Sequence, residues 1–138
     1  MQFSRRDTLA LGLGAAAMTV LPFRALAAAD DAIAAFTGGA DLAEGGVTLT
    51  APEIAENGNT VPISVESEGA VEIMVLATGN PTPGVATFKF GELAGAHSAS
   101  TRIRLAGTQD VVAIAKLADG SFAKASSTVK VTIGGCGG

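Results

Sequence analysis

Apolar and polar residues alternate along much of this chain, and this period-two pattern constrains the fold more than any other feature of the sequence. Between Thr60 and Glu66, for example, Val61, Ile63 and Val65 share one face of an extended segment. Such alternation is typical of strands that place one face on a hydrophobic core and the other in water, as antiparallel sheets do. We therefore expect a fold built from antiparallel β-sheets.

Seven segments are expected to be strands, and turn residues separate them. Most follow this pattern, whereas Val111–Leu117 is a more continuous apolar run, as a central strand would be. Asp119-Gly120 predicts a tight hairpin before the last segment. Pro62 predicts a sheet edge or a strand start, because proline has no N–H to donate. Seven short strands with turns between them predict an all-β, immunoglobulin-like antiparallel β-sandwich. The expected strands are Val47–Thr50, Thr60–Glu66, Val71–Val75, Phe88–Phe90, Arg102–Leu105, Val111–Leu117 and an alternation that ends with Val129, Val131 and Ile133.

A short helix is expected ahead of the sandwich. Asp30 or Asp31 can cap its first turn, since a carboxylate oxygen can accept hydrogen bonds from the unpaired N–H groups there. The helix would bury Ile33 and Phe36 and end at Gly38-Gly39. The chain has no Trp or Tyr, so its core must be filled by aliphatic residues and phenylalanine.

The first 27 residues are expected to be an export signal. The run Ser4–Leu9 contains Arg5-Arg6 and resembles a twin-arginine signal, and an apolar run too short to span a bilayer follows it. Ala25-Leu26-Ala27 offers a small-residue cleavage site. We therefore expect residues 1–27 to be removed and the mature protein to be periplasmic.

The expected mature chain is a small acidic domain. Removal of residues 1–27 lowers the basic count from 9 to 6 and the acidic count from 13 to 12, which changes the formal charge from −4 to −6. A domain of this charge has no electrostatic attraction to nucleic acid or to an anionic lipid surface. Residues 28–133 are long enough for one β-sandwich around a single core.

The C-terminal end carries the only cysteine. Cys136 stands between Gly134 and Gly135 on one side and Gly137 and Gly138 on the other. Glycine has wide backbone freedom and no side chain to cover the sulfur, so residues 134–138 are expected to form a flexible arm that presents a thiol. Three residues beyond the sandwich can reach roughly 10 Å when extended, enough to enter a narrow pocket of another protein.

Other roles for this thiol remain open from the residues alone. A disulfide-linked homodimer would also use one exposed cysteine. A nucleophile would need a base in fixed geometry, and His97 is the only histidine in the sequence. A thiol oxidoreductase would normally carry a second, resolving cysteine. One Cys and one His do not make a closed metal site, and a Gly-rich run at residues 12–17 lies inside the export signal, so neither metal nor cofactor is expected.

Two segments resemble a known family. The unbroken Gly134–Gly138 ending is similar to that of the Y subunit of the periplasmic thiosulfate-oxidising (Sox) carrier complex, and Pro52–Pro62 resembles that family's segment leading into a core strand. The resemblance implies that Cys136 holds sulfur intermediates covalently while separate enzymes act on them. The chain itself would be a carrier, not an enzyme.

The same resemblance implies several partners. It suggests a heterodimer with the family's Z subunit, which has no export signal of its own and would travel folded with this chain. A c-type haem protein, a manganese-dependent sulfate-releasing hydrolase and a molybdenum and haem sulfane dehydrogenase would visit Cys136 in turn. From the residues themselves, Met74 and Leu76 form a second apolar strand face. That face could pack against a partner sheet or be buried within this protein.

Overall fold

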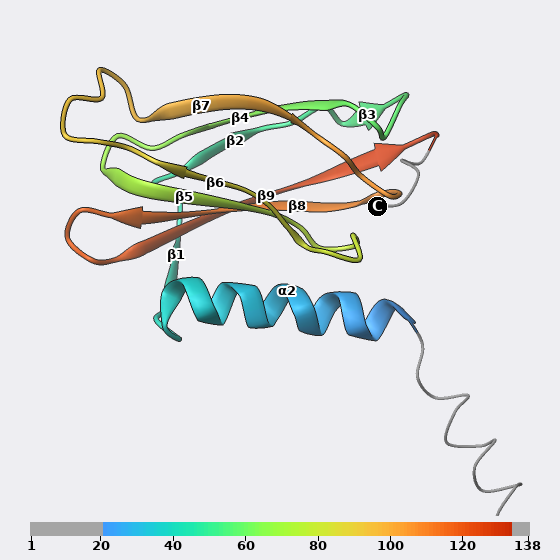
Figure 1. The fold of residues 1–138 in the computed structure, drawn as a ribbon, viewed down its shortest axis with the longest axis horizontal. Coiled ribbons are helices and arrows are strands. Elements are labelled where there is room, and N and C mark those ends of the chain that lie inside the picture. The colour runs from blue at the N-terminus through green and yellow to red at the C-terminus, as the bar shows by residue number, and fades with distance from the viewer. Residues whose placement is uncertain (1–20, 134–138) are drawn as a thin grey trace, which may run out of the picture.

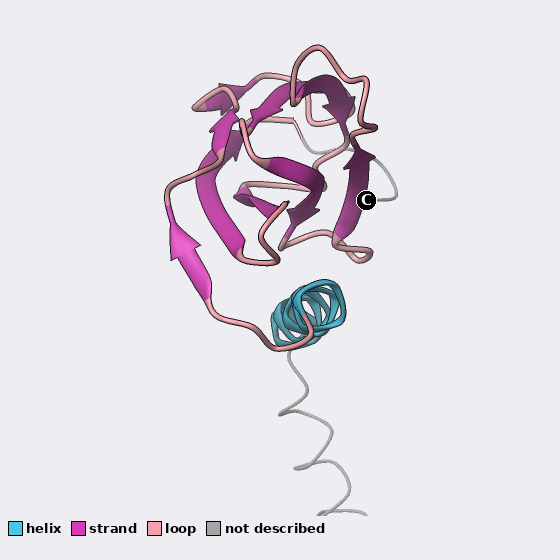
Figure 2. Cartoon of the chain, turned by 90° about the vertical axis from the view of Figure 1, so that its left-hand side faces the viewer, coloured by secondary structure: helices cyan, strands magenta, loops and turns pink. Residues whose placement is uncertain are grey.

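Two β-sheets pack face to face, and one helix lies along the outer side of the larger sheet (Figure 1). This is a computed structural model, and it describes residues 21–133. Viewed end-on in Figure 2, the strands surround a common interior and the helix stands outside it. The expected β-sandwich with an N-terminal helix is confirmed. No helix among the described residues is long and apolar enough to cross a membrane.

The larger sheet has the order β1-β9-β8-β5-β6, with β3 also pairing with β9. The smaller sheet has the order β2-β4-β7. Most neighbours are antiparallel, as expected, but β1 and β3 run parallel to β9. The nine strands within residues 21–133 are β1 (Leu42–Glu44), β2 (Thr48–Thr50), β3 (Ile54–Ala55), β4 (Val61–Glu66), β5 (Ala70–Ala77), β6 (Gly84–Lys89), β7 (Ser98–Ile103), β8 (Gln109–Leu117) and β9 (Phe122–Val131).

The main core lies between the two sheets and follows the predicted alternation. Val61, Ile63 and Val65 of β4 are all buried, whereas Pro62 and Glu66 between and after them are exposed. Across the interior they share one cluster with buried side chains of β5, β8 and β9. Each fully buried aliphatic side chain stabilises the fold by about 1.5–3 kcal/mol relative to an exposed one.

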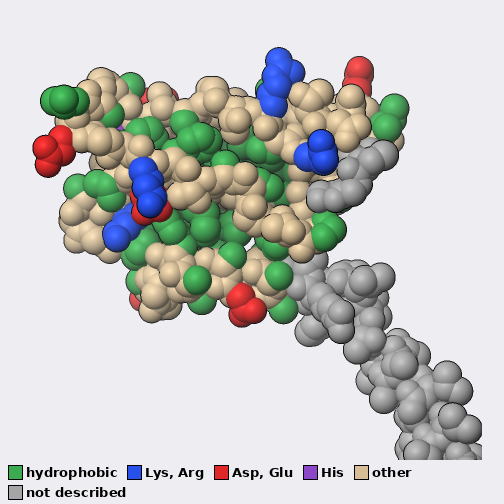
Figure 3. Space-filling view, viewed as in Figure 1, with side chains coloured by type: hydrophobic (Ala, Val, Ile, Leu, Met, Phe, Trp, Pro, Cys, Tyr) green, Lys and Arg blue, Asp and Glu red, His purple; other side chains and the backbone are tan. Residues whose placement is uncertain are grey.

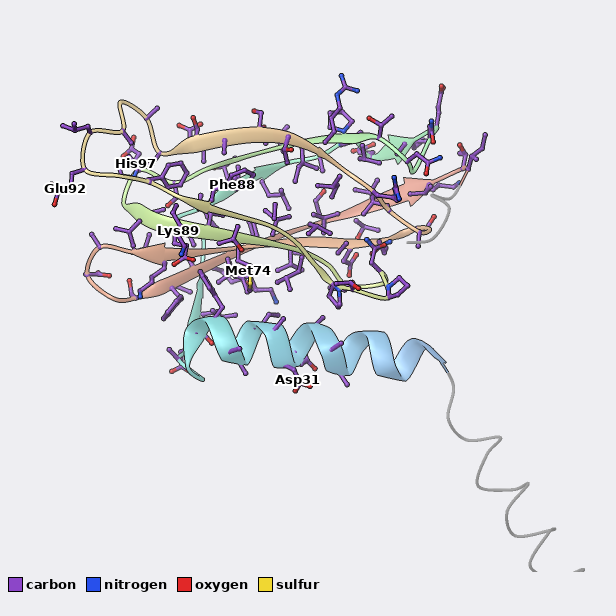
Figure 4. The ribbon with its side chains drawn as sticks, viewed as in Figure 1. Asp31, Met74, Phe88, Lys89, Glu92 and His97 are labelled. Atoms are coloured by element: carbon purple, nitrogen blue, oxygen red, sulfur yellow. The ribbon has the colours of Figure 1, made fainter. Side chains whose placement is uncertain are left out.

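A second apolar cluster lies on the outer face of the larger sheet. Met74 and Leu76 of β5, with Val112 and Ile114 of β8 and Phe122 of β9, pack against the N-terminal helix α2 (Leu21–Thr37). Figure 4 shows Met74 between the sheet and that helix. The sequence left two possibilities for the face that carries Met74 and Leu76: contact with a partner sheet or burial within this protein. The second is correct, because helix α2 covers that face.

Helix α2 is longer than expected and begins earlier. Asp30 and Asp31 lie within it and are exposed, so the prediction that one of them caps the helix is wrong. Leu and Ala, both strong helix formers, extend the helix back to Leu21. The end was predicted correctly, since Gly38 and Gly39 follow with φ of 66° and 84°. The helix also continues through the expected cleavage point after Ala27.

Several strand predictions are confirmed and others are corrected. Strand β2 reaches only as far as Ser64 of β4, so Pro62 has a neighbour on one side alone, Arg102 of β7. The Asp119-Gly120 hairpin joins β8 to β9, with Gly120 at φ 88°. The strand expected at Arg102–Leu105 instead spans Ser98–Ile103, because small polar residues hid its first half.

Candidate functional site: the base of the C-terminal segment

The last strand leads directly to the expected thiol-bearing segment. Strand β9 ends at Val131, and Ile133 is the last described residue. Gly134, Gly135, Cys136, Gly137 and Gly138 lie outside the described residues, as do Arg5-Arg6 and the rest of residues 1–20. The part of the site that the structure describes is therefore the base from which the C-terminal segment leaves the domain. In Figure 1 this base is at the right-hand end, where β9 (red) ends.

The segment from Glu53 to Gly58 holds this base along one side. It lies within Pro52–Pro62, the internal run that resembled the Sox family, and its strand β3 runs parallel to β9. Three backbone N–H···O bonds join the two segments: Lys130 to Glu53 at 2.9 Å, Thr132 to Ala55 at 3.0 Å and Gly58 to Ile133 at 2.7 Å. The Thr132 hydroxyl adds a bond to the Glu56 carbonyl at 3.0 Å. The chain is thus hydrogen-bonded as far as Ile133.

The other side of the base is held by the turn before β8. The Val131 N–H donates to Thr108 Oγ1 at 2.9 Å. The Leu105 N–H donates to the Gly58 carbonyl at 2.7 Å. Gly58, which donates to the Ile133 carbonyl, is therefore itself held by a second hydrogen bond. Each such bond contributes about 0.5–1.5 kcal/mol net. Together they give the C-terminal segment a fixed starting point.

A buried polar pair supports this turn, and sequence reasoning missed it. Asn80 and Gln109 are 3% and 9% exposed and share a hydrogen bond of 2.9 Å from Gln109 Nε2 to Asn80 Oδ1. Asn80 also donates to the Arg104 carbonyl at 2.8 Å and accepts from the Ala106 N–H at 2.9 Å. Gln109 accepts from the Gly79 N–H at 2.8 Å. Asn80 stands in a Gly-Asn-Pro run, where asparagine reads as an ordinary turn residue, so no sequence signal marked it.

Two arginines lie beside this network. Arg102 and Arg104 are exposed and, with Asn80 and Thr82, line a pocket of about 410 Å³ next to the base. No carboxylate lines that pocket. Within the part of the chain described, the only hydrogen bond of either guanidinium joins Arg102 to Thr60 Oγ1 at 3.4 Å. The charges are therefore available to an anion.

His97 lies at the opposite end of the molecule from the base, as Figure 4 shows. It is half-buried, its Nδ1 contacts the Ala70 carbonyl, and its ring lies 5.4 Å from that of Phe90. Strand β7 separates it from the turn at Leu105, and six extended residues span about 20 Å. A C-terminal arm reaching roughly 10 Å does not cover that distance. His97 is therefore a half-buried loop histidine with a structural contact.

The other titratable side chains of the described residues form no further candidate site. In residues 21–133, no group of three or more His, Cys, Asp and Glu side chains is placed to hold a metal ion. Asp119 accepts hydrogen bonds from the Ser121 hydroxyl and N–H, and these bonds lower the pKa of its carboxyl. This carboxylate sits in the β8–β9 hairpin, away from the base of the C-terminal segment.

By its fold, the protein is a β-sandwich, and similar β-sandwiches occur in other protein families. The superoxide reductase (neelaredoxin) from Ignicoccus hospitalis aligns with a TM-score of 0.56 over 63% of this chain and 80% of its own, at 14% identity. The hypothetical protein PH1083 from Pyrococcus horikoshii aligns with a TM-score of 0.53 over 64% and 96%, at 9% identity. Identities this low show a shared fold alone.

The family follows from two closer comparisons. The family model described as sulfur oxidation protein SoxY matches residues 33–136, which include Cys136. The sulfur carrier protein SoxY from Chlorobium limicola is 37% identical and aligns with a TM-score of 0.65 over 75% of this chain and 96% of its own. No curated protein gives a significant match. The chain belongs to the SoxY family.

Proposed function

We propose that this chain is a covalent carrier of sulfur intermediates in thiosulfate oxidation, with Cys136 as the attachment site. The observation that carries the proposal is the family match through Cys136, together with the 37% identity to a protein described as a sulfur carrier. The chemistry fits the residue. A thiolate can be joined to a sulfur species through an S–S bond, and nucleophilic attack can later break that bond.

The described residues support a division between a fixed base and a reaching tip. Hydrogen bonds extend to Ile133, and three further residues lead to Cys136. With two glycines on either side, the thiol would reach roughly 10 Å from the domain and enter the active sites of several enzymes. In this proposal residues 134–138 are the swinging arm, and the chain carries substrate without catalysing its conversion.

The proposal places the mature protein, from about residue 28, in the periplasm after twin-arginine export. The family implies a heterodimer with the Z subunit (SoxZ). The partner enzymes would be a c-type haem protein that attaches thiosulfate, a manganese-dependent hydrolase that releases sulfate and a dehydrogenase that oxidises the remaining sulfane sulfur. Because helix α2 covers the outer face of the larger sheet, the Z subunit would bind a different surface.

A reconstituted assay tests this function. The mature chain and its Z subunit are mixed with the Sox enzymes, and thiosulfate-dependent cytochrome reduction and sulfate release are measured. We expect Cys136→Ser to abolish both activities. Gly135→Pro combined with Gly137→Pro should lower them while leaving the thiol reactive, because proline fixes φ and stiffens the arm. Full turnover by Cys136→Ser would exclude the carrier role and favour a structural, disulfide-linked sandwich.

A further inference from the structure

The pocket lined by Arg102 and Arg104 has the properties of a binding site for a small anion. The chain has a formal charge of −4, yet no carboxylate lines this pocket. On the face shown in Figure 3, two basic side chains (blue) lie over the right-hand half with no acidic side chain between them. Positive charge is therefore concentrated at the pocket, against the sign of the whole chain.

We propose that this pocket binds a free tetrahedral oxyanion, of the class of sulfate and thiosulfate, without forming a covalent bond. The inference goes beyond the proposed function, because the residues that line the pocket lie between positions 59 and 104 and Cys136 takes no part. A guanidinium presents several N–H donors in a fixed plane, which suits the oxygens of such an anion. The occupant is the dissolved ion itself.

Neither guanidinium is neutralised within the part of the chain that the structure describes. The only hydrogen bond of either one joins Arg102 Nη1 to Thr60 Oγ1 at 3.4 Å, and an uncharged hydroxyl leaves the positive charge in place. Thr82 lies on the wall of the same pocket, and its hydroxyl makes no hydrogen bond to any described residue. Two charged donor groups and one hydroxyl therefore remain available to a ligand.

The two arginines are spaced to bind one ligand together. Ile103 between them is buried, whereas Arg102 and Arg104 are both exposed, so the two arginine side chains leave the same face of the extended chain. At that spacing their Cα atoms are about 6.6 Å apart. Side chains as long as arginine can converge from this separation on a single tetrahedral anion, and each guanidinium can donate to different oxygens.

The backbone that carries Arg104 is held in place on both sides. Asn80 Nδ2 donates to the Arg104 carbonyl at 2.8 Å, and the next N–H, that of Leu105, donates to the Gly58 carbonyl at 2.7 Å. Asn80 is itself buried and bound to Gln109. The pocket wall is thus preorganised, and anion binding has to order only the two arginine side chains.

The expected affinity is modest and depends on salt. Both guanidinium groups are exposed, so water and counterions compete with the ligand. We therefore expect half-saturation at about 1–10 mM anion. Sulfate and thiosulfate should bind more tightly than chloride, because their several oxygens accept from both guanidinium groups at once. Loss of both arginines should weaken binding by roughly tenfold or more.

Anion titration of the ¹⁵N-labelled mature Cys136→Ser protein tests this site. The substitution removes the thiol, so every change of signal reports noncovalent binding. Sodium thiosulfate, sodium sulfate and sodium phosphate are each added, and sodium chloride at matched ionic strength is the control for screening. Heteronuclear NMR follows the Nε–Hε signals of Arg102 and Arg104 and the backbone amide of Thr82, which still reports binding when both arginines are replaced.

We expect thiosulfate and sulfate to shift these signals along a saturable curve, and chloride to shift them little. Arg102→Gln with Arg104→Gln should abolish the saturation, whereas Lys89→Gln with Lys116→Gln, which changes the net charge equally at exposed sites elsewhere, should not. Similar binding of phosphate would support recognition of the tetrahedral oxyanion shape.

Equal shifts with chloride, saturation with phosphate alone, or saturation that survives the loss of both arginines would each overturn the proposal. None of these results bears on the carrier function, because the titrated protein has no thiol and the reconstituted assay measures that function with Cys136 in place.

Discussion

The buried Asn80–Gln109 pair gives the sharpest test of how the base of the C-terminal segment is built. Asn80→Ala removes three hydrogen bonds at once: those to the Arg104 carbonyl, the Ala106 N–H and Gln109 Nε2. Gln109 Nε2 keeps its bond to a neighbouring carbonyl, so two backbone groups lose their side-chain partner. At about 1 kcal/mol per bond, with a further penalty for buried groups left unpaired, we expect a loss of roughly 2–4 kcal/mol.

Urea unfolding of the mature protein measures this loss. At an m value of about 2 kcal/mol/M, the midpoint should fall by about 1–2 M. Asn57→Ala is the matched control, because Asn57 is exposed and its side chain accepts only the Asn59 N–H, at 3.0 Å, among the described residues. It should cost less than about 1 kcal/mol. Equal midpoints for the two variants would refute the reasoning that the buried network fixes this end of the sandwich.

Three further predictions concern the core, the close approach of Gly79 to strand β8 and the response to acid. Leu76→Ala, at a fully buried site between β5 and helix α2, should lower the free energy of unfolding by about 2–5 kcal/mol in thermal or urea denaturation. Gly79→Ala should destabilise the fold, since a Cβ there would lie 3.0 Å from the side chain of the buried glutamine. Bonds from Ser121 lower the pKa of Asp119, so its contribution to stability is complete above its ordinary value of 3.8 and is lost as pH falls through the lowered pKa. Asp119→Asn should remove that acid dependence from a stability profile measured between pH 2 and 7.

Control variants at exposed or open sites show which effects are specific to the predicted contacts. Ile54→Ala, at a side chain that is 58% exposed, should cost much less than the core truncation. Gly84→Ala, where an added Cβ meets nothing within 4 Å, should change stability little compared with Gly79→Ala. A Gly79→Ala protein as stable as Gly84→Ala would contradict the close approach of Gly79 to the first residue of β8. An unchanged acid profile for Asp119→Asn would contradict the role of the Ser121 bonds.

The strands were predictable because their alternation records burial on one face, and β4 follows it residue by residue. The Gly38-Gly39 helix end and the Asp119-Gly120 hairpin were predictable because both rest on local backbone chemistry. Strands β1 and β3 were not, since each is two or three residues long and exists only through parallel pairing with β9. Propensity extended helix α2 beyond the expected cap, and a tertiary contact decided the fate of the Met74 face.

Part of the candidate site was also predictable from the sequence, and part was not. Sequence reasoning identified Cys136 and its glycines, because a lone cysteine in a glycine run is a local signal. It did not identify the base, because Thr108, Asn80 and Gly58 meet only when distant segments fold together. The pairing of the Pro52–Pro62 segment with β9 gives that family-like run a physical role, which is to hold the end of the last strand.

Intact mass spectrometry of the mature protein, purified from cells growing on thiosulfate, tests the central claim most directly. The account predicts additions of about 32, 80 or 112 Da for sulfane, sulfonate or thiosulfonate cargo. Reductant should remove them, and the Cys136→Ser protein should carry none. An unmodified thiol throughout growth on thiosulfate, or only a disulfide-linked homodimer, would contradict the carrier function.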